Sequence, residues 1–176
     1  MIGQRPAQRA RLIGLLLAFA AALWGCATSP PEPSGTPTRS ATAADPGSCP
    51  VTLPGRGPDD ISPDRFFGWG SSYGNDALWV GGLWPDGILA AGPEFVEDDE
   101  SIGMKFGWWR RVDGALEITG RRLDRPGPAV RGEVPDSYGP SGFTPSGVFF
   151  PGERCWEVTG RVGEASLTFV TFVVRI

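Results

Sequence analysis

Glycine and proline interrupt the chain after Cys49 so often that its apolar residues fall into short runs. These runs, about four to nine residues long, are apolar or alternate between apolar and polar, and none keeps a helical period. Short runs separated by Gly, Pro and Asp clusters are typical of β-sandwiches and barrels. We therefore expect an all-β domain with strands near residues 50–53, 77–83, 88–91, 103–111, 116–123, 130–134, 147–150, 154–162 and 166–175.

Composition narrows the possible functions. The chain of 176 residues has 40% hydrophobic residues, enough for a core, although it contains 26 Gly and 18 Pro. Its formal net charge of −4 argues against a nucleic-acid partner. It has no histidine, which excludes His-based catalytic triads and His metal ligands. We expect no catalytic residue of these kinds and no cofactor.

The N-terminus has the features of an export signal. A basic segment with Arg5, Arg9 and Arg11 precedes an apolar run over residues 12–24, which is too short to cross a bilayer as a helix. The sequence LWGC that ends at Cys26 resembles the bacterial lipobox. That resemblance implies a signal peptide over residues 1–25, a diacylglycerol thioether on Cys26, and a fatty acid such as palmitate on the new N-terminus. An ordinary secretory signal cleaved nearby is the alternative.

A linker is expected over residues 26–48, followed by the sandwich domain over residues 49–176. Residues 27–48 contain no Leu, Ile, Val or aromatic residue and are rich in Pro, Ser and Thr, so they cannot form a core of their own. With a lipid on Cys26, the chain would be anchored to the cell membrane on its extracytoplasmic face.

The three cysteines agree with this arrangement. Acylation of Cys26 would leave Cys49 and Cys155 as a pair, and an oxidising compartment would join them. Closing a loop of about 106 residues contributes on the order of 4 kcal/mol in the chain-entropy model.

The last hairpin is the clearest local feature. Residues 154–162 place Trp156, Val158 and Val162 on one face, and residues 166–174 are apolar on both faces, which indicates a central or covered strand. The sequences GFTPSGVFFP (142–151), CWEVTG (155–160) and ASLTFV (165–170) resemble the ending of a group of uncharacterised bacterial exported lipoproteins. The resemblance implies an immunoglobulin-like antiparallel β-sandwich and export, and it implies no activity.

A second hairpin supplies the candidate ligand-binding residues. If Asp113 and Gly114 form a two-residue turn between 103–111 and 116–123, Trp109 faces the core and Trp108 is displayed. A displayed Trp108 beside Arg110, Glu117 and Arg121 could stack on a sugar or hold an anionic group, which suits an envelope polysaccharide. The alternative places Trp108 under a loop.

An acidic run is the weak candidate for a metal site. Glu97, Asp98, Asp99 and Glu100 offer clustered oxygens that suit Ca²⁺, but they lack the alternating spacing of known calcium loops. A solvated acidic loop is the competing interpretation.

Two classes of function follow from these features. The first is a lipid-tethered module that binds an envelope component or another exported protein, without catalysis. The alternative is a carbohydrate-active or peptidoglycan-processing enzyme with two carboxylates facing each other, for example Asp59 or Asp60 with Asp76 or Glu157.

Overall fold

Nine strands form within residues 46–176, the part of the chain that the computed structural model describes. Four short 3₁₀ helices lie between and before them: η1 (Pro46–Ser48), η2 (Pro63–Arg65), η3 (Trp69–Ser71) and η4 (Pro93–Phe95). The strands are β1 (Ser72–Gly74), β2 (Leu78–Gly81), β3 (Ile88–Ala91), β4 (Ile102–Arg110), β5 (Glu117–Arg122), β6 (Arg131–Glu133), β7 (Gly142–Phe150), β8 (Arg154–Val162) and β9 (Ala165–Arg175).

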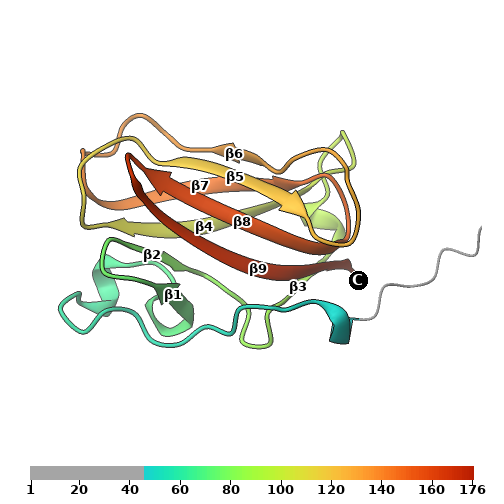
Figure 1. Cartoon of the computed structure of the whole chain (residues 1–176), viewed down its shortest axis with the longest axis horizontal. Helices are drawn as coiled ribbons and strands as arrows, with labels where there is room; N and C mark the ends of the chain where they lie inside the picture. Colours follow the sequence, from blue (N-terminus) through green and yellow to red (C-terminus); the bar gives the residue numbers. More distant parts are fainter. Residues whose placement is uncertain (1–45) are drawn as a thin grey trace, which may run out of the picture. The chain divides into compact units, whose positions relative to one another are not determined.

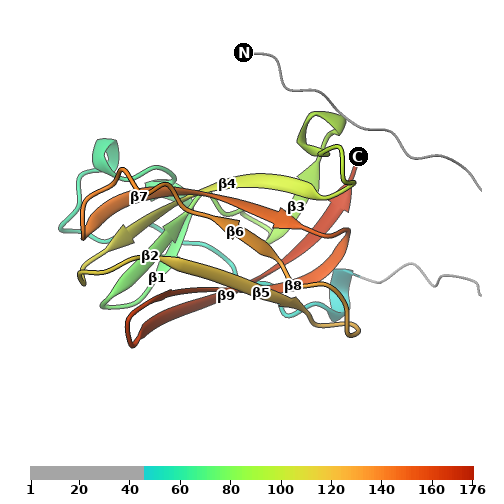
Figure 2. The ribbon, with the colours of Figure 1, turned by 90° about the horizontal axis from the view of Figure 1, so that it is seen from above.

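The strands make two sheets that pack face to face. Sheet A has the order β1-β2-β4-β7-β6 and is antiparallel throughout. Sheet B has the order β3-β9-β8-β5, in which only β3 pairs in parallel, with β9. Figure 1 shows sheet B in front, and Figure 2 shows the two layers one above the other. The described residues therefore form an all-β two-sheet sandwich.

Aromatic side chains from both sheets fill the space between them. Phe169 of β9 contacts two rings of β4, with centroids 5.5 Å from Phe106 and 6.4 Å from Trp108. Phe150 of β7 meets Trp156 of β8 at 6.0 Å. All five side chains are buried. The core is thus built by residues that alternate along strands of opposite sheets, as sandwich packing requires.

The last hairpin forms as the sequence predicts. Trp156, Val158 and Val162 of β8 are buried in the core. The doubly apolar β9 is a central strand between β3 and β8. Its second apolar face is also covered, because Phe172 packs with Cys49 and Cys155 in a separate small cluster.

The disulfide between Cys49 and Cys155 is confirmed. It ties the segment before the first strand to β8. The same segment lies along β9, where the Thr52 amide donates to Val170 O and Thr52 Oγ1 accepts from the Val170 amide. The expected strand at 50–53 is nevertheless wrong, because this contact does not continue as a ladder.

Two further predictions of local structure need correction. Residues 103–111 and 116–123 do not form a hairpin: β4 pairs with β2 and β7 in sheet A, whereas β5 pairs with β8 in sheet B. The Asp113–Gly114 turn therefore carries the chain from one sheet to the other. β7 begins at Gly142 rather than near 147, and Pro145 lies inside it.

Several predictions concern residues before 46. The signal peptide, the lipid on Cys26 and most of the linker lie outside the described residues. Within residues 46–176 no helix is long and apolar enough to span a membrane.

Candidate functional site

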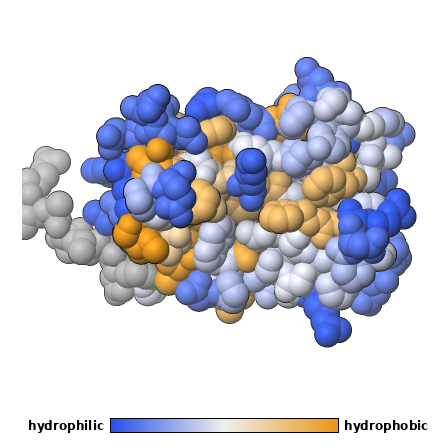
Figure 3. All heavy atoms as spheres, turned by 180° about the vertical axis from the view of Figure 1, so that it is seen from behind, coloured by the Kyte–Doolittle hydropathy of each residue, from blue (hydrophilic) through white to orange (hydrophobic). Residues whose placement is uncertain are grey.

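Two hollows adjoin Lys105, an outward-facing residue of β4 in sheet A. Lys105 is exposed and lines two hollows, of about 510 Å³ and about 590 Å³. We call these two hollows together the Lys105 groove. Figure 3 shows hydrophobic residues gathered in the middle of this side of the molecule. The groove is lined by Phe67, Gly82, Trp84, Glu94, Phe95, Glu97, Gly103, Met104, Lys105, Glu133, Val134, Pro135, Pro145, Ser146, Gly147 and Phe149.

Two glycines form the floor of the groove beside Lys105. A Cβ atom added at Gly103 would lie 3.1 Å from the Phe149 ring, and one at Gly147 would lie 3.0 Å from it. The ring therefore lies over both backbones, and the Arg131 guanidinium lies over the ring, 3.9 Å from its centroid. A larger residue at either glycine would displace Phe149 and fill the groove.

Phe67 forms part of the opposite wall, and the backbone fixes its position. Gly68 has φ +74°, and a Cβ there would lie 2.0 Å from the Gly82 nitrogen, so only glycine allows the two segments to approach. Its neighbour Phe66 is buried and contacts Trp109 edge-on at 6.3 Å. Phe67 is left 59% exposed. Phe67 therefore offers an apolar ring to any molecule that occupies the groove.

The groove combines one cation with three carboxylates. Glu133 reaches it from β6, and Glu94 and Glu97 reach it from the segment after β3. Glu133 forms an ion pair with Arg131. Among the ion pairs of residues 46–176, none involves Lys105. Its ammonium group and the carboxylates can therefore serve as hydrogen-bond donors and acceptors for a ligand.

The sequence-based prediction for Trp108 is wrong. Trp108 is fully buried between the sheets, and its indole N–H donates to Ser146 Oγ at 3.1 Å. It is Trp109 that lies on the outer face, beneath Phe66 and with the Arg65 guanidinium 5.6 Å from its ring centroid. Trp108 and Trp109 point to the opposite faces from those predicted, because β4 belongs to sheet A and does not pair with β5.

The other three residues of that candidate site are separated by the same change. Glu117 and Arg121 lie on β5 in sheet B, where Arg121 forms an ion pair with Glu157. Arg110 is a buried residue at the end of β4 in sheet A. The structure therefore does not bring the four predicted ligand-binding residues together.

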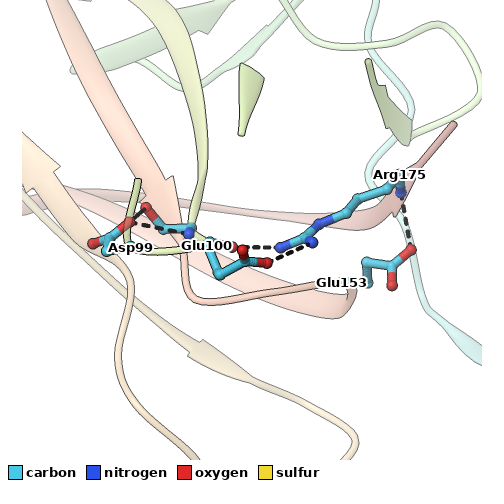
Figure 4. A network of polar contacts seen from close by, with 5 residues as sticks. Asp99, Glu100, Glu153 and Arg175 are labelled. Carbon is cyan, nitrogen blue, oxygen red and sulfur yellow. Dashed lines mark hydrogen bonds and ion pairs between the residues drawn. The ribbon is translucent and has the colours of Figure 1, made fainter. Parts of the chain in front are cut away.

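Two residues of the acidic run, Asp99 and Glu100, have side-chain partners (Figure 4). Asp99 accepts hydrogen bonds from the Ser101 hydroxyl at 2.6 Å and from the Ser101 amide at 3.1 Å. The Ser101 hydroxyl is the main reason that the pKa of Asp99 is lowered. Glu100, which has φ +67°, forms an ion pair with Arg175. Within residues 46–176 no three or more Cys, Asp or Glu side chains are grouped so as to hold a metal ion.

Two of the four carboxylates considered for catalysis have arginine partners. Asp60 forms an ion pair with Arg111, and Glu157 forms one with Arg121.

Sequence reasoning missed most of the Lys105 groove. Gly103, Gly147 and Phe149 come from two strands that are distant in the sequence, since the paired residues Gly103 and Phe149 have 45 residues between them. One signal was available in the sequence. Gly103 and Gly107 lie on the same face of one apolar strand, and glycine inside a strand often marks a place where another group approaches the backbone closely.

Comparisons with models of protein families, with curated proteins and with solved structures found no match.

Proposed function

We propose that this chain is a lipid-anchored, extracytoplasmic binding protein whose ligand is a glycan of the cell envelope that lies in the Lys105 groove. The observation that carries this proposal is the groove itself, which has a glycine floor, aromatic walls and charged groups of both signs. The lipid on Cys26 and the location belong to the same proposal, and they are supported by the lipobox resemblance and by the disulfide.

A glycan fits this surface better than an extended peptide does. A peptide that adds to a sheet needs a free edge, whereas the floor of the groove is formed by the paired strands β4 and β7. A ligand on a paired face must bind to side chains. Sugar rings offer C–H faces to Phe67 and Phe149, and hydroxyl groups to Lys105 and Glu133.

We also propose that the sandwich is of the immunoglobulin type, in line with the resemblance of its C-terminal strands to exported lipoproteins. The strand order supports this. With β2 as A and β3 as A′, the strands β4 to β9 follow as B to G, which yields the sheets A-B-E-D and A′-G-F-C. The disulfide departs from that family's pattern, because it joins strand F to the segment before strand A.

The binding function can be tested with a soluble glycan of N-acetylated sugars. The full chain, expressed with its leader and purified in detergent, is labelled with ¹⁵N and titrated with chitotetraose. We expect saturable shifts of the amide signals of Gly103, Lys105 and Gly147, and a loss of affinity of at least fivefold in Phe149→Ala and in Lys105→Met. Thr168→Ala, on the outer face of sheet B, is the control and should bind like the wild type.

Two results would overturn the proposal. The first is the absence of shifts in the groove. The second is an equal loss of affinity in the control. Chromatography of the chitotetraose after long incubation tests the enzyme alternative, because shorter sugars that depend on a named carboxylate would establish catalysis.

A further inference from the structure

Arg110 is buried without a carboxylate partner among the described residues. Only 4% of it is exposed. Its guanidinium donates to three backbone carbonyls: Nη1 to Gly114 O at 2.6 Å and Pro140 O at 3.0 Å, and Nη2 to Gly139 O at 2.6 Å. Burial lowers the pKa of Arg110, and the charge of Asp113 raises it by less. Three carbonyls hold the guanidinium in place, but they do not neutralise it.

Two polar atoms in this region have no hydrogen-bond partner. They are Arg110 Nε and Thr144 Oγ1, and both are fully buried. Both residues line the same hollow of about 310 Å³, between residues 114–116 and residues 134–140. Unsatisfied buried polar groups are uncommon and call for an explanation. Less than 1 Å² of either atom is accessible, so a ligand in the hollow reaches them only when the lining side chains move.

We propose that Arg110 and Thr144 bind a carboxylate group in this hollow. Both hydrogens of Nη1 are used by carbonyls, and one of Nη2 is used, so the Nε–H and the second Nη2 hydrogen remain. Two such N–H groups on one side of a guanidinium match the two oxygens of a carboxylate, and the Thr144 hydroxyl adds a third donor. The charge of the ligand would neutralise the buried cation.

Solvent-exposed residues line part of this hollow. Asp136 lines the hollow but is exposed, so its charge is screened by solvent. Tyr138, 42% exposed, lies in the same lining. The hollow also shares Val134 and Pro135 with the Lys105 groove. The carboxylate site does not rest on the proposed glycan function, because its donors are Arg110 and Thr144, which lie outside the groove.

The test uses sodium acetate as the probe and the Arg110 Nε–H signal as the reporter. The ¹⁵N-labelled full chain in detergent is titrated with acetate at constant ionic strength, set with sodium chloride. We expect a saturable shift of the Arg110 Nε–H signal, with no comparable shift for acetamide, which has the same shape and no charge. Thr144→Val should raise the acetate concentration at half-saturation about tenfold.

A matched control and a competing anion complete the design. Thr168→Val makes the same substitution on sheet B and should leave acetate binding unchanged. An unmoved Arg110 signal, or an equal shift with acetamide, would overturn the site. Sulfate that binds as tightly as acetate would contradict the carboxylate assignment. The chitotetraose titration reports on different signals, so either proposal can fail alone.

Discussion

Trp108 of sheet A lies directly against Gly160 of sheet B. A Cβ atom added at Gly160 would come within 2.4 Å of the Trp108 ring, too close for any side chain. Gly160 is a paired residue in the middle of β8, between Ile118 of β5 and Leu167 of β9. Trp108, one of two fully buried tryptophans of the core, therefore occupies space that exists only because residue 160 has no side chain.

The Gly160→Ala substitution should destabilise the domain by about 1–3 kcal/mol, because the added methyl group forces Trp108 off its packed position. Urea unfolding followed by tryptophan fluorescence measures the change. Gly70→Ala is the control, since a Cβ there meets nothing within 4 Å, and we expect a change within about 0.5 kcal/mol. Equal effects of the two substitutions would contradict the packing described here.

Removal of the disulfide should also be costly. The Cys49–Cys155 bond closes a loop of 106 residues, and its loss should reduce the free energy of unfolding by about 2–5 kcal/mol. The double variant Cys49→Ala, Cys155→Ala is compared with wild type by urea unfolding without reductant. A wild-type sample with reductant should match the double variant. If reductant changes nothing, the bond does not contribute to stability.

The sequence predicts local features of this fold better than distant pairings. The β8–β9 hairpin was predicted because its alternation and the turn at residues 163–164 lie within one short segment. The faces of β4 were assigned wrongly because Asp113 and Gly114 are typical of a tight hairpin turn, while the actual partners of β4 are β2 and β7, and β7 begins 32 residues after β4 ends. The first half of β7 was not predicted because it contains Pro145 and Gly147, and both residue types weaken a strand prediction.

The candidate sites show the same limit. The sequence suggested Arg110 as a ligand-binding residue because Trp108 lies two residues before it. What makes Arg110 a candidate in the structure is its burial near Thr144, and this depends on the pairing of β4 with β7. The Lys105 groove depends on glycines of two strands that meet across the sheet. Charge, export features and cysteine pairing need no tertiary contacts to be inferred, and the cysteine pairing is confirmed.

The carboxyl group of Asp99 should titrate below its ordinary range. Ser101 is the main cause, because its hydroxyl and amide both donate to the ionised form. Since the pKa is lower in the folded state, the stabilisation by Asp99 is present above the unfolded pKa of about 3.9 and is lost as the pH falls through the folded value. A ¹³C NMR titration measures the midpoint. Ser101→Ala should raise the midpoint only part of the way toward the ordinary value, because the hydrogen bond from the residue 101 backbone amide remains. An unchanged midpoint would contradict this account.

The lipid anchor on Cys26 gives the most direct test of location. Expressed with its leader in a bacterial host, the wild-type chain should enter the detergent phase in a phase-separation assay, and its mass should match a chain that starts at Cys26 with a diacylglycerol and an added acyl group. Cys26→Ser should move the protein to the aqueous phase, because no thioether can form. The Cys49–Cys155 bond should persist in this variant, which serves as the control for folding and export. An aqueous wild-type protein without lipid would favour the ordinary secretory signal and remove the anchor from the proposed function, while the Lys105 groove would remain to be tested on its own.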